Sequence, residues 1–275
     1  MRNEVIKIWE NEINGFNPTL TTYLLDDPLE KNRRRPAVLI CPGGGYWCCS
    51  PREGEPVALK FLSAGFHAFV LEYSTQTTAP GMAYTQPLLD ISRAMCILRE
   101  NADKWNVESD KITVCGFSAG GHLAASLGTM WDKDYIQNHP EITTGQNKPN
   151  ALILGYPLIT FGEHTAYGCF DSLAGKGAPN ELKKELSLEF NVTADTPPTF
   201  IWHTVDDSVV PIENAMMFAS ALQKNKVPFE MHLYSQGPHG ISLATDEVSE
   251  QEGGSIPHVA TWIDLCIEWL KEITK

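Results

Sequence analysis

The chain has 275 residues, of which 43% are hydrophobic, and a formal net charge of −13 at pH 7. This length and hydrophobic content suffice for a full buried core, and we expect a single domain over residues 1–275. The negative charge is spread along the chain without a long basic run, so we expect no nucleic-acid partner and no attraction to anionic lipid surfaces.

Residues 1–15 are charged and lack the apolar centre of a secretory signal, and no run approaches the roughly 18 apolar residues of a membrane span. The seven cysteines are odd in number, irregularly placed and without zinc-ligand spacing, which is typical of reduced thiols. We therefore expect a cytoplasmic protein with no membrane segment, no metal and no cofactor.

Two segments of alternating character, residues 5–10 and 20–25, open the chain before any helical pattern, and they predict an antiparallel pair at a sheet edge. Further short apolar, β-branched runs predict strands at 38–41, 66–73, 112–117, 151–157, 200–204 and 229–234. Longer amphipathic stretches predict helices at 53–64, 86–101, 119–130, 212–225 and 262–273.

This alternation of strands and helices predicts an α/β fold with a mostly parallel central sheet and helices on both of its faces. The least regular regions, about 132–150 and 160–196, are rich in Gly, Pro, Asn and Asp. They predict loops and a small cap over the functional site.

The sequence Gly116-Phe117-Ser118-Ala119-Gly120 lies between a predicted strand and a predicted helix, the setting of a G-x-S-x-G nucleophile elbow. Glycines at 116 and 120 avoid the steric conflict that a Cβ would create in so tight a turn. Ser118 would then lie at a helix N-terminus, whose amides favour developing negative charge. Because such pentapeptides also arise by chance, the interpretation needs a base and an acid to support it.

Loops after two later predicted strands provide an acid and a base in the order that this fold requires. Asp206 and Asp207 compete for the role of acid, and we prefer Asp207 because it precedes the turn into the next helix, whereas Asp206 could hydrogen-bond within the loop. His239 lies in a Pro-His-Gly loop that suits a presented general base. The remaining histidine candidates fit structural roles in predicted strands and helices: His122, His203, His232 and His258.

Three consecutive glycines follow the strand at 38–41 and predict an oxyanion hole. We assign its donors to the amides of Gly44, Gly45 and Ala119, with Gly43 making the turn. The alternative, a phosphate-binding loop, requires either a Lys-Ser/Thr ending or G-x-G-x-x-G spacing, and neither occurs here.

Aromatic residues near these motifs suggest an apolar mouth for the substrate, although each could equally belong to the core. We assign substrate contacts to Tyr46, Trp47 and Tyr156.

With CPGGGYW, GFSAGGHLA, HTVDDSVVP and PHG in this order, the chain from about residue 35 to its end resembles the α/β-hydrolase superfamily. The resemblance is to its acetyl-xylan-esterase-like and hormone-sensitive-lipase-like carbohydrate esterases. It implies the α/β-hydrolase fold, a Ser118-His239-Asp207 triad and hydrolysis of short-chain, acetyl-type esters. Many relatives have histidine where this chain has Pro42, which puts in doubt the hydrogen bonds that would brace the glycine loop.

The implied partner is a small-molecule ester, such as an acetylated sugar, and a homodimer is a further possibility. Glycosidase activity does not follow, since we identify no facing carboxylate pair. Two alternatives remain: an amide hydrolase of the arylformamidase or small-peptidase type, and a catalytically silent binding protein with the same fold.

Overall fold

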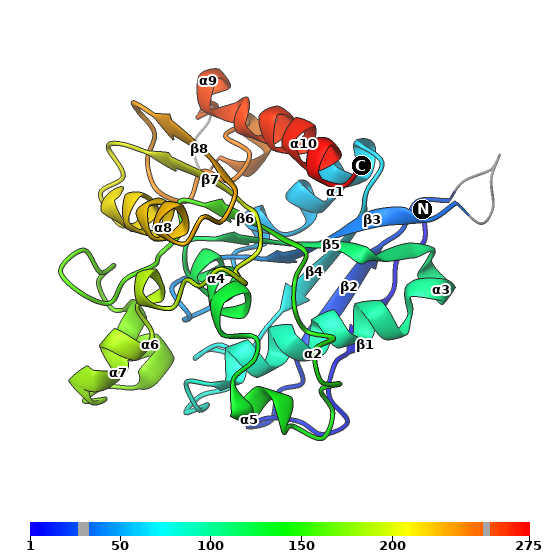
Figure 1. Cartoon of the computed structure of the whole chain (residues 1–275), viewed down its shortest axis with the longest axis horizontal. Coiled ribbons are helices and arrows are strands. Elements are labelled where there is room, and N and C mark those ends of the chain that lie inside the picture. The colour runs from blue at the N-terminus through cyan, green and yellow to red at the C-terminus, as the bar shows by residue number, and fades with distance from the viewer. Residues whose placement is uncertain (27–32, 250–253) are drawn as a thin grey trace.

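The computed structural model describes residues 1–26, 33–249 and 254–275. Its central feature is an eight-stranded sheet in the order β1-β2-β4-β3-β5-β6-β7-β8 (Figure 1). The strands are β1 (Val5–Lys7), β2 (Thr19–Tyr23), β3 (Arg35–Cys41), β4 (His67–Glu72), β5 (Val107–Phe117), β6 (Ala151–Gly155), β7 (Thr199–Thr204) and β8 (Phe229–Tyr234). The predicted strands are therefore all present, with shifted ends.

The sheet is parallel from β4 to β8, and its other edge is antiparallel. Strand β1 pairs with β2, and β2 pairs with β4, both in antiparallel register. The predicted antiparallel edge is thus confirmed. No helix separates β1 from β2, whereas parallel neighbours need a crossover connection.

Helices cover both faces of the sheet (Figure 1). One face packs against α1 (Glu55–Ser63) and α10 (Trp262–Ile273), and the other against α2 (Gln86–Glu100), α4 (Ala119–Met130) and α8 (Glu213–Lys224). Alternate side chains of β3 enter the two cores, Leu39 with one and Val38 with the other, as a strand buried on both faces requires. The α/β-hydrolase fold predicted from the sequence is confirmed.

Short helices occupy much of what the sequence pattern predicted as loops. Region 160–196 contains α6 (Cys169–Ala174), α7 (Asn180–Glu185) and the 3₁₀ helix η2 (Leu188–Phe190). Helices α6 and α7 project at the side where β5 runs into α4 (Figure 1). The remaining short helices are η1 (Pro51–Glu53), α3 (Ala102–Trp105), α5 (Asp134–Gln137), η3 (Asp246–Val248) and α9 (Pro257–Ala260).

The region 132–150 contacts helix α2 and the N-terminal segment. Asn147 Nδ2 hydrogen-bonds Ser92 Oγ of α2 at 3.3 Å, and the Trp9 and His139 rings lie 4.9 Å apart. Parts of this segment therefore pack against α2 and the stretch that follows β1, because their polar and aromatic groups have partners there.

Within the described residues, none of the helices combines the length and the apolar character of a membrane span.

Candidate active site

Ser118 occupies a strained turn between β5 and α4. Its φ of 53° and ψ of −120° lie in a region that residues with a Cβ rarely adopt. A Cβ on Gly116 would lie 2.1 Å from the carbonyl oxygen of Gly120, and a Cβ on Gly120 would lie 2.1 Å from that of Cys41. Only glycine fits at both positions, so the backbone can hold Ser118 at the end of the strand.

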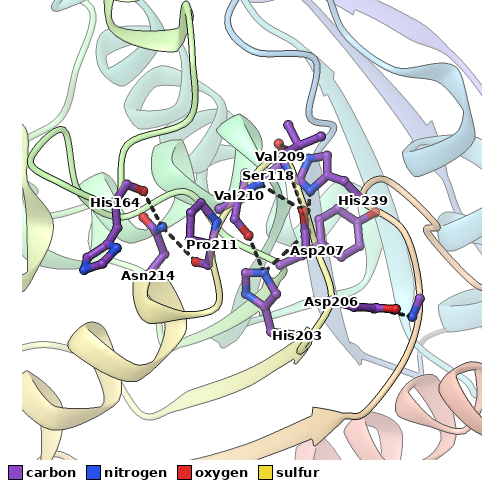
Figure 2. Close-up of polar contacts among 12 residues, drawn as sticks. Ser118, His164, His203, Asp206, Asp207, Val209, Val210, Pro211, Asn214 and His239 are labelled. Atoms are coloured by element: carbon purple, nitrogen blue, oxygen red, sulfur yellow. Dashed lines mark hydrogen bonds and ion pairs between the residues drawn. The ribbon is translucent and has the colours of Figure 1, made fainter.

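The hydroxyl of Ser118 meets the ring of His239, which in turn meets Asp207 (Figure 2). Ser118 Oγ lies 2.8 Å from His239 Nε2, and His239 Nδ1 lies 2.7 Å from Asp207 Oδ2. An ionised carboxylate can only accept, so Nδ1 carries the proton and Nε2 is left to accept from the serine hydroxyl. This is the arrangement in which an imidazole can act as a general base.

The Asp207 carboxylate is fully buried and takes hydrogen bonds on both oxygens. Oδ1 accepts from the amides of Val209 and Val210, both at 2.9 Å, and Oδ2 accepts from His239. Burial by itself would raise the pKa of Asp207, but the hydrogen bonds from His203 and His239 outweigh it and hold the pKa well below its usual range. The carboxylate is therefore ionised at neutral pH.

A second buried histidine also contacts this carboxylate, and the sequence analysis gave it only a structural role. His203 Nε2 lies 3.3 Å from Asp207 Oδ2 and 3.0 Å from the carbonyl oxygen of Val210. Both neighbours are acceptors, so Nε2 carries the proton and His203 donates toward Asp207. The only sequence signal is the spacing of four residues between His203 and Asp207.

The neighbouring Asp206 has a different role, in keeping with the loop-bonding alternative. Its Oδ1 accepts from the Gly237 amide at 2.7 Å, which joins the loop after β7 to the loop after β8 (Figure 2). Thus Asp207 contacts the ring of His239, while Asp206 braces the loop that carries it.

The glycine loop after β3 approaches Ser118 closely. A Cβ on Gly43 would lie 2.9 Å from the Ser118 Cβ, so the backbone can come this near only without a side chain. The turn itself is made by Gly44 and Gly45, whose φ angles are +124° and +64°, and not by Gly43 as we predicted. Within the described part of the chain, the amides of Gly44, Gly45 and Ala119 have no protein acceptor.

Glu53 supports this loop, and the sequence analysis missed it. Its Oε2 accepts from the Gly43 amide at 2.6 Å, and its Oε1 accepts from the Tyr156 hydroxyl at 2.6 Å. The same hydroxyl accepts from the Ser242 amide at 2.9 Å, which extends the network to the segment after His239. Burial raises the pKa of Glu53, and the hydrogen bonds from Tyr156 and Gly43 oppose that rise. In the sequence, Glu53 is only an acidic residue at the start of a predicted helix, and nothing there indicates that it hydrogen-bonds the glycine loop.

Two of the three predicted substrate contacts are buried. Tyr46 and Tyr156 each expose 1% of their surface, whereas Trp47 exposes 60%. The Tyr46 hydroxyl donates to His122 Nδ1 at 2.7 Å, and the Tyr156 ring lies 5.1 Å from that of His239. The prediction for Tyr46 and Tyr156 is therefore corrected. Both side chains are buried, and their hydroxyls hydrogen-bond the protein groups His122 and Glu53.

His122 links the glycine loop to the segment that follows α7. Its Nε2 donates to the carbonyl oxygen of Leu186 at 2.8 Å, while Nδ1 accepts from Tyr46. Burial lowers the pKa of His122 to about 4, so the ring is neutral at pH 7.

Asn214, the second residue of α8, ties the segment before α6 to the start of α8. Its Nδ2 donates to the carbonyl oxygens of His164 and Pro211, both at 2.9 Å (Figure 2). No group of three or more His, Cys, Asp and Glu side chains placed to hold a metal ion occurs in residues 1–26, 33–249 and 254–275.

Comparison with known proteins places these features in a family. The family described as BD-FAE matches residues 25–222. The chain is 42% identical over 246 residues to endo-1,4-beta-xylanase B of Butyrivibrio fibrisolvens, covering 87% of this chain and 38% of that protein. It is 29% identical over 223 residues to the acetylxylan esterase of Xylanibacter ruminicola, covering 79% of this chain and 43% of that protein. The chain thus spans less than half the length of these two relatives.

A solved structure matches over nearly its whole length. The acetyl ester-xyloside bifunctional hydrolase of Caldicellulosiruptor lactoaceticus is 38% identical, with a TM-score of 0.87, and the match covers 99% of this chain and 97% of that one.

Proposed function

The chain belongs to the BD-FAE family, and from this premise we propose that it is a carboxylic ester hydrolase in which Ser118 is the nucleophile, His239 the general base and Asp207 the acid. The observation that carries the proposal is the unbroken chain of hydrogen bonds, 2.8 Å from Ser118 Oγ to His239 Nε2 and 2.7 Å from His239 Nδ1 to Asp207 Oδ2. The strained backbone of Ser118 supports it further, because unfavourable conformations persist where a function depends on them.

In the first step, His239 Nε2 takes the hydroxyl proton as Ser118 Oγ attacks the ester carbonyl carbon. The buried, ionised Asp207 stabilises the resulting imidazolium and holds the ring in orientation. Negative charge moves to the carbonyl oxygen, where the amides of Gly44, Gly45 and Ala119 would donate to it. Their lack of protein acceptors within the described residues supports this role.

The tetrahedral intermediate then expels the alcohol, which takes the proton from His239 Nε2 and leaves an acyl group on Ser118. Water enters, gives a proton to the same nitrogen and attacks the acyl carbon. Collapse of the second intermediate releases the carboxylic acid and returns the proton to Ser118. The cycle consumes one ester and one water.

We propose an acetyl-type acyl group and a carbohydrate alcohol as the substrate. The names of the Xylanibacter and Caldicellulosiruptor proteins support this choice, since they specify acetylxylan and an acetyl ester. Glycoside hydrolysis is not part of the proposal. The buried carboxylates at this site, Asp207 and Glu53, are both engaged by protein hydrogen bonds and not free to flank a glycosidic bond.

The test compares Ser118→Ala with the wild type on p-nitrophenyl acetate and on an acetylated xylo-oligosaccharide. We expect kcat to fall by about 10⁴ or more on both substrates, because the nucleophile is lost. Ser63→Ala is the matched control, since that serine hydrogen-bonds a carbonyl oxygen at the exposed end of α1. Full activity in Ser118→Ala would overturn the proposal. Wild-type turnover of an N-formyl aromatic amine in preference to both esters would favour amide hydrolysis instead.

A further inference from the structure

A groove lies next to the glycine loop, and the catalytic mechanism does not use it. It encloses about 610 Å³, and its lining includes Trp47 and Tyr167, which precedes α6. That volume falls within the range of about 300–1,000 Å³ that small-molecule sites have. We call it the Trp47–Tyr167 groove.

Two of the segments that line the groove contact the glycine loop. The Trp47 amide donates to the carbonyl oxygen of Gly44 at 2.9 Å, so the indole begins in the same turn. Cys169 follows the lining residue Gly168, and its Sγ would lie 3.5 Å from a Cβ on Gly45. A ligand in the groove would therefore lie beside the loop whose amides we propose as donors to the ester carbonyl oxygen.

Three chain segments form the walls, and Gln76 joins them. Its amide donates to the carbonyl oxygen of Tyr46 at 3.1 Å, and its side-chain Nε2 donates to the carbonyl oxygen of Ser172 in α6 at 2.7 Å. Thr77 donates through both its amide and its hydroxyl to the carbonyl oxygen of Trp47, at 3.0 Å and 2.9 Å. These hydrogen bonds join the backbone of the three segments.

The side chains of the groove combine exposed aromatic faces with groups that donate and accept hydrogen bonds. Tyr167 is fully exposed, and Trp47 is the exposed aromatic of the glycine loop. Asp171 and Lys176 contribute one negative and one positive charge, so the lining is neutral as a whole. Large apolar side chains gathered at a surface hollow with polar neighbours indicate a binding site.

These features fit a neutral sugar. The rings of a sugar present C–H faces that pack on aromatic side chains, and their hydroxyls need donors and acceptors at the rim. An aliphatic chain would leave the polar groups of the groove unpaired, and a ligand of either charge would meet a like charge, from Asp171 or from Lys176.

We propose that the Trp47–Tyr167 groove binds neutral sugar residues that flank the acetylated one, so that the enzyme prefers acetylated oligosaccharides to acetylated monosaccharides. This inference rests on the proposed ester hydrolysis at Ser118 and extends it from the acyl group to the length of the carbohydrate.

The first experiment measures kcat/KM of the wild type for acetylated xylotetraose, acetylated xylose and p-nitrophenyl acetate. We expect kcat/KM for the oligosaccharide to exceed that for the monosaccharide by about tenfold, because a few aromatic contacts contribute the corresponding binding free energy. Tyr167→Ala and Trp47→Ala should remove most of this preference, mainly through KM. The exposed position of Tyr167 means that its truncation leaves the fold intact.

Phe190→Ala is the matched control, because Phe190 is also an exposed aromatic of the cap region, with 65% of its surface accessible, but does not line the groove. It should retain the wild-type preference. Equal rates on both sugars in the wild type, or a preference that survives in Tyr167→Ala, would overturn the proposal.

A second experiment is independent of turnover. Unacetylated xylotetraose is titrated into Ser118→Ala protein by calorimetry, and we expect binding that Tyr167→Ala weakens about tenfold. Ester hydrolysis by the wild type without any oligosaccharide binding would refute the groove and leave the proposed function standing. Oligosaccharide binding that depends on Tyr167, in a wild type that cleaves no ester, would refute the proposed function and support the groove.

Discussion

Replacing Tyr156 with phenylalanine removes one hydroxyl group from the network behind the glycine loop. This hydroxyl donates to Glu53 Oε1 at 2.6 Å and accepts from the Ser242 amide at 2.9 Å. Both partners are buried, so neither can exchange the lost hydrogen bond for one to bulk water. The change should therefore destabilise the protein although it preserves the aromatic ring and its packing against His239.

The expected magnitude follows from these two hydrogen bonds. A hydrogen bond to a charged group contributes about 1.5–3 kcal/mol, and a buried amide left without an acceptor costs about 1–3 kcal/mol. Because the two contributions share one hydroxyl and the site can relax, we expect the free energy of unfolding to fall by about 3 kcal/mol. At about 2–4 °C for each kcal/mol in a chain of this size, Tm should fall by about 6–12 °C.

The assay is equilibrium urea denaturation followed by tryptophan fluorescence and far-ultraviolet circular dichroism, with thermal melts in parallel. Tyr234→Phe is the control, because the one hydrogen bond of its hydroxyl within the described residues is a long one, 3.4 Å to Thr261 Oγ1. We expect that variant to change the free energy of unfolding by less than about 0.5 kcal/mol. If Tyr156→Phe is no less stable than Tyr234→Phe, the network does not stabilise the loop as we argue.

Three further predictions concern the proposed acid, the elbow and pH. Asp207→Asn should lower kcat/KM by about 10³–10⁴ while the circular dichroism spectrum is unchanged, and a loss below tenfold would argue against its role. Gly120→Ala should lower the free energy of unfolding by about 3 kcal/mol or more, because its Cβ would lie 2.1 Å from the carbonyl oxygen of Cys41. Gly162→Ala is the control, because a Cβ there would meet only the Thr160 hydroxyl, at 3.2 Å, and it should lower the free energy of unfolding by less than about 1 kcal/mol. Equal losses for the two variants in urea denaturation would refute the steric argument. Since burial lowers the pKa of His122 from 6.5 to about 4, the unfolded state binds the proton first as pH falls. Stability should therefore be lost between pH 6.5 and 4, by about 3 kcal/mol from this residue, and His122→Gln should flatten that slope in denaturation series at several pH values.

The sequence was sufficient for the order of strands and helices because each element carries its own local signal. Strand β5 and helix α4 were predicted from runs of apolar residues, and the Ser118 turn from the glycines on either side of it. The loops of Asp207 and His239 could be placed near Ser118 for a topological reason. Parallel strands present their carboxyl ends at one edge of the sheet, so loops that are distant in sequence meet there.

The tertiary structure alone decided which polar groups support that edge. Glu53 and Tyr156 are 103 residues apart, and His122 and Leu186 are 64 apart, so no local pattern marks either pair. Burial is not visible in the sequence either. We therefore predicted Tyr46 and Tyr156 as substrate contacts, whereas both side chains are buried and hydrogen-bond other protein groups.

What the sequence by itself determined is the fold and the loops that carry Ser118, Asp207 and His239, since local periodicity and turn chemistry depend on neighbouring residues. Only the tertiary structure decided three other features: the contact of His203 with Asp207, the hydrogen bond of Glu53 to the glycine loop, and the groove that Trp47 lines. Burial and hydrogen-bond partnership depend on how distant segments pack, and that is a property of the whole fold.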